Sequence, residues 1–330
     1  MTRLRFEADP SPADAALVRA AETAPENPFL TSAFAEAQRR MGREIALLSL
    51  RNEANWVSCC YAGVKRGGLR VTVQIFSLPA MGADSDFGDG LTRFCRSVGA
   101  DLAIVDSFGS RVHGVPPLPG EVTRRSRLEH VWGLQGADLW GGLSANHRRN
   151  VTRARKSGIV MVAAEGRSGL RTHMSLTDAS LARREQRGEQ VETEGAHESG
   201  WGALLDTGAG TLFQAQREGE VLSSILVLKA REGAYYHSAG TSPEGMRLGA
   251  SQLLVFEVAS RLAAEGLSVF NLGGAEPSSE GLYRFKVGFG TAPQPLEAAS
   301  YRMSGTVRRG ILWLADSVRG KLRPEVRDPS

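Results

Sequence analysis

The chain has 330 residues, 42% of them hydrophobic and 23% charged, a composition typical of globular proteins and long enough for about two domains. Its net charge of +4 permits a polyanionic partner but does not require one. The three cysteines, Cys59, Cys60 and Cys95, lack Cys-x-x-Cys spacing. This excludes a disulfide framework and a zinc site built on them, and it favours a reducing compartment.

The sequence also shows no targeting signal. The first ten residues carry no apolar segment of the kind that a signal peptide needs. No apolar run approaches the roughly 18 residues that would span a bilayer. We therefore expect a cytoplasmic, monomeric protein with no transmembrane segment and no DNA partner.

The first 142 residues predict helices followed by strands. A helix over 12–22 has Ser11 as a possible cap, and a helix over 31–40 has Thr31 or Ser32 in the cap position. The next elements are strands at 45–50, 56–62 and 70–78, a loop at 81–90, a helix at 91–98, a buried strand at 102–105, a loop at 113–119 and a strand at 128–134. Asp106 ends the buried strand. It is either a site residue or a turn former.

A basic helix is predicted from Ser144, its cap, to a stop at Gly158. Its basic residues are Arg148, Arg149, Arg153, Arg155 and Lys156. They cannot all lie on one helix face, so part of the charge is ordinary solvated surface. The alternative is contact with the phosphates of tRNA or a nucleotide, for which Arg148, Arg149 and Arg153 are the candidates.

The remaining elements again alternate. They are a strand at 159–164, a helix at 170–186, a polar loop at 187–200, a hairpin over 212–228 with its turn at Glu218-Gly219, a strand at 233–239, a loop at 243–249, a helix at 250–265 and a strand at 267–272. The strand at 233–239 carries Tyr236 and His237, which could line a pocket; a structural histidine is the alternative.

Both halves of the chain follow one order of elements: hairpin, glycine-rich loop, helix, glycine, strand. This order predicts duplication of one α/β unit, although the residues themselves do not form a formal repeat. After the second unit, residues 306–322 have the pattern of a basic amphipathic helix. Such a helix can bind membranes, but packing on the protein itself is the more common arrangement.

The most informative stretch runs from Phe270 to Gly290. A strand ending in Gly273-Gly274 is followed by a polar loop and then by Gly-Leu-Tyr-Arg-Phe-Lys-Val-Gly-Phe-Gly. The lysine, Lys286, lies among aromatic residues that favour burial and glycines that allow close approach of a ligand. Such a lysine either lines a pocket wall or extends its amine out to solvent.

A strand ending in Leu-Gly-Gly, a short loop and Gly-Leu-x-x-Phe-Lys-x-x-Phe-Gly resembles the C-terminal signature of Fem-type peptidyltransferases and of BioF2-like or CelD-like acyltransferases in the GNAT superfamily. The resemblance implies an α/β fold with mixed sheets and two tandem GNAT-like units. The first unit would be 1–142, with a C-terminal helix in 304–330 returning to it. The second, 143–303, would carry the Phe-Lys motif.

The resemblance also implies site residues. Lys286 would lie at the acyl-transfer site with Phe285 beside it. Arg39 adjoins Gln38, the position at which Fem-type chains hold a lysine that contacts the nucleotide-linked acceptor. Asp106 and the arginine pair Arg183 and Arg184 would face the acceptor, and Tyr236 could orient its amine.

Other chemistries lack their motifs. The sequence shows no nucleophile elbow, no phosphate-binding P-loop and no histidine pair with zinc spacing, so we expect no metal and no tightly bound cofactor. The coenzyme A pattern Arg/Gln-x-x-Gly-x-Gly/Ala, aligned on Gly249, fails at Met246 and Ser251. The loop before the 250–265 helix could still present backbone N–H groups to a phosphate.

The sequence therefore predicts an acyltransferase that moves an aminoacyl group from aminoacyl-tRNA, or an acyl group from acyl-CoA, onto an amine of a small-molecule, cell-wall, polysaccharide or peptide acceptor. Aminoacyl-tRNA is the favoured co-substrate, because the coenzyme pattern is broken and the second unit opens with a basic helix. The alternative is a non-catalytic GNAT-like protein that binds a polysaccharide or peptide.

Overall fold

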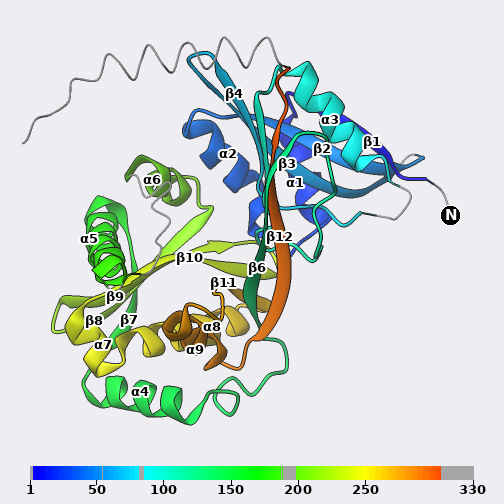
Figure 1. The fold of residues 1–330 in the computed structure, drawn as a ribbon. Coiled ribbons are helices and arrows are strands. Elements are labelled where there is room, and N and C mark those ends of the chain that lie inside the picture. The colour runs from blue at the N-terminus through cyan, green and yellow to red at the C-terminus, as the bar shows by residue number, and fades with distance from the viewer. Residues whose placement is uncertain (1–2, 54, 82–84, 187, 189–197, 306–330) are drawn as a thin grey trace, which may run out of the picture.

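A computed structural model describes residues 3–53, 55–81, 85–186, 188 and 198–305, which form one mixed sheet with helices on both faces (Figure 1). The strands of the first half are β1 (Arg5–Asp9), β2 (Glu44–Asn52), β3 (Asn55–Gly67), β4 (Arg70–Ile75) and β5 (Leu102–Val105). Its helices are α1 (Asp14–Glu22), the 3-10 helix η1 (Pro28–Leu30), α2 (Ser32–Arg40) and α3 (Phe87–Ser97).

The second half has the same plan. Its strands are β7 (Val160–Ala164), β8 (Gly210–Arg217), β9 (Glu220–Lys229), β10 (Gly233–Thr241) and β11 (Val269–Gly274). Its helices are α4 (Ala145–Lys156), α5 (Gly166–Gln186), α6 (Glu198–Asp206), α7 (Pro243–Leu248), α8 (Ala250–Ala264) and α9 (Glu280–Val287). Two long strands, β6 (Glu121–Gly133) and β12 (Ala292–Arg302), run between the halves (Figure 1).

The strand order is β1-β2-β3-β4-β5-β12-β6-β11-β10-β9-β8-β7. The order from β1 to β12 in one half matches the order from β7 to β6 in the other, six strands in each. The parallel pair β4–β5 of the first half corresponds to the parallel pair β10–β11 of the second. The duplicated α/β order predicted from the sequence is therefore present. The last strand of each unit is exchanged: β6 pairs with β11 of the second unit, and β12 pairs with β5 of the first. Strands β6 and β12 thus cross between the two units in space, and the domain boundary predicted near residue 142 stays a prediction.

Local signals account for several element ends. The Thr31 hydroxyl accepts from the N–H of Phe34 at 3.1 Å, and the Ser144 hydroxyl accepts from the N–H of His147 at 3.2 Å, so both predicted caps are present. Glu218 and Gly219 both have positive φ, at 53° and 83°, as a two-residue turn between β8 and β9 requires.

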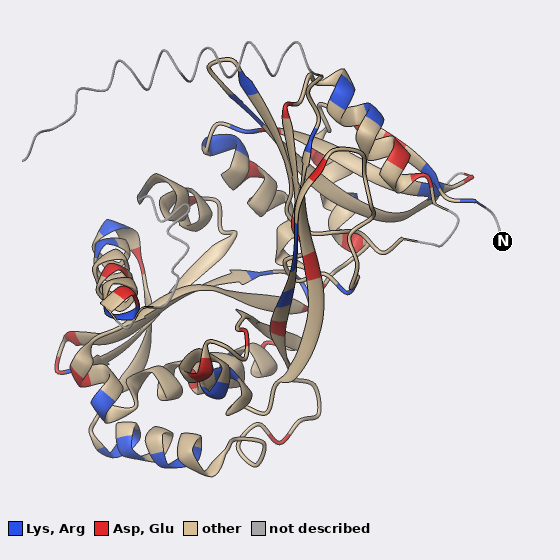
Figure 2. Ribbon diagram, viewed as in Figure 1, with Lys and Arg blue, Asp and Glu red and all other residues tan. Residues whose placement is uncertain are grey.

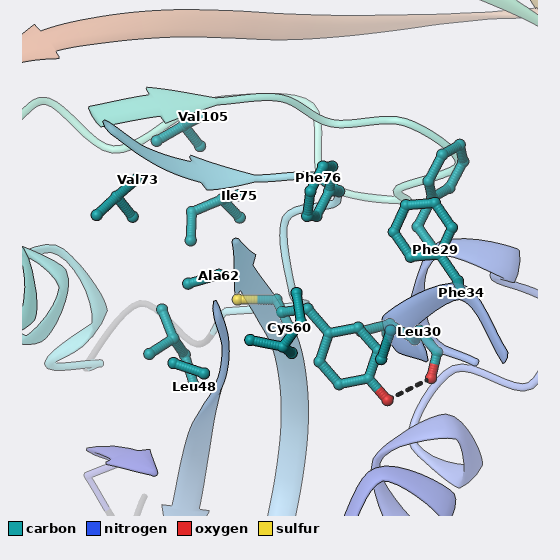
Figure 3. Close-up of a cluster of buried hydrophobic side chains, with 14 of the residues drawn as sticks. Phe29, Leu30, Phe34, Leu48, Cys60, Ala62, Val73, Ile75, Phe76 and Val105 are labelled. Atoms are coloured by element: carbon teal, nitrogen blue, oxygen red, sulfur yellow. Dashed lines mark hydrogen bonds between the residues drawn. The ribbon is translucent and has the colours of Figure 1, made fainter. Parts of the chain in front are cut away.

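One hydrophobic cluster fills the first unit and extends under α5 and α6; a second lies under α4 and α8. In Figure 3, the rings of Phe29, Phe34 and Phe76 pack edge to face beside Cys60 and Ile75 of the sheet. Ring centroids 5.2 Å apart in both pairs give these contacts specificity beyond area burial. All three cysteines are buried and free.

Several boundaries differ from the sequence prediction. Helix α3 begins at Phe87, inside the predicted loop, and residues 243–248 form helix α7 where a loop was expected. Strand β6 begins at Glu121, well before the predicted start at 128. Its first half is exposed and polar, so it lacks the apolar alternation by which strands were predicted. The sequence patterns did not predict β1, β12 or α6. The predicted tail helix at 306–322, and most of the predicted 187–200 loop, lie outside the described residues.

Candidate acyl-transfer site

The second unit opens where β10 and β11 separate. The two strands pair in parallel from Gly233↔Val269 to Tyr235↔Asn271. Beyond that pair the register of β10 against β9 shifts between Tyr236 and Ser238. On β11 the chain turns at Gly273, which has φ +72° and whose N–H donates a 2.8 Å hydrogen bond to the Asn271 side-chain oxygen. The parallel ladder of β10 and β11 therefore ends at this pair, and we call the place where it ends the gap.

Lys286 lies at this gap. It is on α9, and only 4% of its surface is exposed. Its Nζ donates a 2.6 Å hydrogen bond to the carbonyl oxygen of Gly274 and lies 5.7 Å from the centroid of the Tyr236 ring. The amine therefore does not extend out to solvent, which was one of the two arrangements expected from the sequence; the other, a place on a pocket wall, stays a prediction.

An aromatic contact holds α9 in place. The His147 ring of α4 lies 4.4 Å from the Phe289 ring, and its Nε2 is 2.8 Å from the Phe285 carbonyl oxygen. A Cβ on Gly288 would lie 2.6 Å from the His147 ring, so glycine is needed for this approach. Phe285 packs its ring on Phe289, at 5.1 Å. In this structure Phe285 is thus a packing residue of α9; its predicted contact with substrate stays a prediction.

The electrostatics around Lys286 follow from its burial. Loss of water lowers the pKa of the ammonium to about 7, opposed by the negative charge of Glu129 and reinforced by the positive charges of Arg184 and Arg127. Near neutral pH this amine therefore exchanges between its charged and neutral forms. Arg184 is the member of the predicted arginine pair that acts on the Lys286 charge. Arg183 instead donates to the Thr241 carbonyl at 2.5 Å.

Glu129 was not singled out from the sequence. It has no exposed surface. Its Oε1 accepts from the Arg127 guanidinium and the Tyr235 hydroxyl, both at 2.8 Å. Its Oε2 accepts from the Asn271 amide at 2.7 Å and the Gly109 N–H at 3.1 Å. The signal in the sequence was a carboxylate inside the apolar strand predicted over 128–134. Three of its four donors, Gly109, Tyr235 and Asn271, are 20 or more residues away along the chain, so the sequence could not place them beside it.

Two predicted residues belong to the first unit. The Asp106 carboxylate accepts from the Gln74 amide at 3.2 Å and lies 3.9 Å from the Arg125 guanidinium. Arg39 on α2 donates to the Pro12 carbonyl at 3.3 Å. Neither is among the groups that act on the Lys286 charge. His237, at the irregularity of β10, is exposed.

Lysine and arginine residues are concentrated along α4, where the ribbon is blue in Figure 2. Arg148 donates to the Leu143 carbonyl at 2.6 Å, and Arg153 donates to the Arg247 carbonyl at 2.8 Å. Arg155 pairs with Glu257 at 2.7 Å. These three side chains therefore close loops and pack helices as well as carrying charge. Arg149 is exposed, and it forms no ion pair with the described residues.

Two cavities are found, and Lys286 lines neither of them. One of about 760 Å³ is bordered by the amino-terminal half of α5, by α6 and by Arg40 of α2. The other, about 130 Å³, lies at the junction of the two units, and Gly109, Tyr235 and Asn271 are among its lining residues. Three of the four donors to Glu129 thus face this smaller cavity. Within the described chain, no cluster of three or more metal-ligand side chains could hold an ion.

Comparison with known proteins identifies the architecture. Residues 143–287 match the family model of the acetyltransferase (GNAT) domain. The chain has a GNAT-like fold. A tandem GNAT protein from the clavulanic acid biosynthesis pathway is similar over 92% of this chain and 99% of its own, with a TM-score of 0.57 and 11% identity. The fold is therefore two GNAT-like units in tandem.

Two further solved structures have this fold. FemX is similar over 93% of this chain and 99% of its own, with a TM-score of 0.64 and 15% identity. The second is the C-terminal domain (DUF2156) of a protein from Agrobacterium fabrum described as a lysylphosphatidylglycerol synthetase. It is similar over 93% of this chain and 98% of its own, with a TM-score of 0.52 and 16% identity. The search of curated proteins found no match. At these identities the likeness shows the fold alone.

The GNAT segment before α8 differs from the expected open loop. The Ser242 hydroxyl accepts from the N–H of Gly245 at 3.0 Å, so α7 is capped by its own chain. Gly249, at φ +80°, precedes α8 and lies against α4. A Cβ at this position would be 2.7 Å from the Asn150 carbonyl oxygen, so the close approach requires glycine. No described helix is long and apolar enough to cross a membrane.

Proposed function

We propose that the protein transfers an acyl group onto an amine at the gap between β10 and β11, with aminoacyl-tRNA as the preferred donor and acyl-CoA as the other candidate. The observation that carries this proposal is the position of Lys286. Its amine is buried where the parallel strands of a GNAT fold separate, and among the described residues its hydrogen-bond acceptor is the Gly274 carbonyl.

The chemistry needs donors rather than a covalent nucleophile. As an amine attacks the acyl carbonyl, its oxygen gains negative charge and the leaving group must be stabilised. A protonated lysine has three N–H donors, of which Gly274 takes one. The other two can serve the carbonyl oxygen or a donor phosphate. Holding donor and acceptor together supplies much of the remaining rate.

The charge around the gap fits an anionic donor. Lys286, Arg127 and Arg184 contribute positive charge, and Glu129 contributes negative charge. The phosphates of either donor would meet this excess. The preference for aminoacyl-tRNA rests on the broken coenzyme pattern, on the self-capped α7 that replaces an open phosphate loop, and on the resemblance to Fem-type enzymes.

The test offers the purified protein labelled aminoacyl-tRNA or labelled acetyl-CoA, with a panel of amine acceptors: short peptides, amino sugars and polysaccharide fragments. We expect base-stable amide label from aminoacyl-tRNA that Lys286→Met loses. Lys229→Met is the matched control, because Lys229 lies on β9 in a surface ion pair with Glu265. Label from acetyl-CoA alone would select the other donor. Saturable acceptor binding without transfer from either donor would instead support a non-catalytic binding protein.

A further inference from the structure

Glu129 lies where three parts of the protein meet. It is on β6, the strand that the first unit contributes to the second. Its donors come from the loop after β5 (Gly109), from β10 (Tyr235), from β11 (Asn271) and from β6 itself. An ionised carboxylate only accepts hydrogen bonds, and its two oxygens take all four of these donors.

Two of those donors lie at the gap between β10 and β11. Tyr235 and Asn271 are the last residues paired between β10 and β11. Each binds a different oxygen of Glu129, so one carboxylate ties together the two strands at their point of separation. In addition, Glu129 is the register partner of Gly274, whose carbonyl oxygen accepts from Lys286.

The charged and titratable groups around Lys286 come from each element packed against it. Strand β6 supplies Glu129, Arg127 and His130, whose pKa is lowered by burial, and α5 supplies Arg184. Strand β10 supplies the Tyr236 ring. Glu129 is the negative group among those that act on the lysine charge.

We propose that Glu129 is a positioning residue of the acyl-transfer site: it ties β10 to β11 where their ladder ends, and from its place opposite Gly274 its negative charge favours the charged form of Lys286. This proposal rests on the function proposed above for Lys286. Burial and two arginines favour the neutral amine, and a neutral amine is a poor partner for a developing oxyanion or a phosphate. The charge of Glu129 opposes that loss of the proton.

The test reads the Lys286 charge directly and needs no substrate. The chain has five lysines, Lys65, Lys156, Lys229, Lys286 and Lys321, so a [13C]lysine NMR spectrum is simple, and Lys286→Met assigns the signal of interest. We expect the Lys286 Cε shift to titrate near pH 7, where burial places its pKa at about 7, well below the roughly pH 10.4 of an ordinary lysine.

Replacing the carboxylate should move that midpoint down. In Glu129→Gln the midpoint should fall by about one pH unit, because the attraction between two buried charges is removed. Glu129→Asp keeps the charge and should restore most of the shift. The matched control is Glu297→Gln. Glu297 is a carboxylate of β12 in the same sheet, bound to Arg124 and the Val115 N–H, and its replacement should leave the midpoint unchanged.

An unchanged midpoint in folded Glu129→Gln would overturn the proposal. If that variant does not fold, Arg127→Gln combined with Glu129→Gln removes the buried pair together, which costs less than leaving one charge alone. The midpoint should still fall, since the effect of Glu129 on Lys286 exceeds that of Arg127; a rise or no change would overturn the proposal.

Activity supplies a separate readout. In an acyl-transfer assay, the alkaline limb of the rate profile should move down in Glu129→Gln by the same interval as the NMR midpoint. A merely structural role would lower the rate at every pH without moving that limb. If wild-type protein transfers no acyl group, the proposed function fails, while the NMR result still decides whether Glu129 sets the charge of Lys286.

Discussion

The Nζ of Lys286 lies 2.6 Å from the carbonyl oxygen of Gly274, so the lysine of α9 is bonded to the end of β11, twelve residues earlier in the chain. The two halves of the Phe270–Gly290 stretch therefore form one local structure. The strand end supplies an acceptor, the following loop turns the chain, and α9 returns the amine to the gap. This contact directs the remaining N–H groups of Lys286 away from Gly274.

Removing the amine should abolish most turnover. Lys286→Met keeps much of the apolar stem and removes the charge, and we expect the rate at saturating substrates to fall roughly 30- to 1,000-fold, or about 2–4 kcal/mol, as for removal of one oxyanion donor. Acceptor affinity should change little. Steady-state kinetics of wild type, Lys286→Met and the control Lys229→Met test this, with circular dichroism as the check on folding. Equal rates would remove Lys286 from the mechanism.

The same substitution should have a pH-dependent effect on stability. Lys286 titrates at about 7 in the folded protein and near 10.4 when unfolded, so between these values the unfolded chain binds more protons and wild-type stability rises with pH. Below pH 7 the folded protein bears the full free-energy cost of burying the charged ammonium. Relative to wild type, Lys286→Met should therefore gain about 2–3 kcal/mol more at pH 6 than at pH 9. Urea unfolding at both pH values measures it, and a pH-independent difference would contradict a buried titrating lysine.

Coenzyme binding should be weak. The coenzyme pattern fails at Met246 and Ser251, and α7 uses the Ser242 hydroxyl to cap its own N–H at Gly245. We expect calorimetry to give a dissociation constant for acetyl-CoA weaker than about 100 μM, or less than about 5.5 kcal/mol of binding free energy. Micromolar or tighter binding would reverse the donor preference.

Binding of tRNA should depend on salt through α4. Each phosphate neutralised by a basic side chain releases counterions, so log affinity should fall linearly with log salt concentration. Replacing Arg148, Arg149 and Arg153 with alanine should reduce the slope by about 0.7–0.9 for each phosphate that is no longer neutralised. Alanine at Arg93 and Arg96 of α3 is the control. If the slope persists in the triple variant, α4 is ordinary solvated surface.

The corner between α7 and α8 should tolerate no side chain at Gly249. Alanine there would adopt φ +80° and place its Cβ 2.7 Å from the Asn150 carbonyl oxygen. Gly158 is a matched control, because it has φ +74° but no atom within 4 Å of an added Cβ. We expect Gly158→Ala to cost about 1–2 kcal/mol from the left-handed backbone alone. Gly249→Ala should lower the free energy of unfolding by more than that. Similar urea midpoints for the two variants would show that α4 moves aside without cost.

The sequence by itself determined the elements whose signals are local. Caps such as Thr31 and Ser144, the turn at Glu218-Gly219 and the repeated order of elements all depend on residues within a few positions of each other. For that reason the duplicated α/β plan and the Phe-Lys motif could be predicted from the chain alone. Helix α7 was missed because its proline and glycines are typical of a loop, whereas packing of Gly245 on the Leu222 carbonyl holds a helical turn there.

Only the tertiary structure decided which side chains share the site. The exchange of β6 and β12 between units depends on strand pairing far apart in sequence, which alternation within a strand does not encode. Lys286 is buried because His147, 138 residues earlier in the chain than Phe285, docks α9. Glu129 meets Asn271 across 142 residues. A buried charge is stable only where distant donors converge on it, and that convergence is a property of the folded chain.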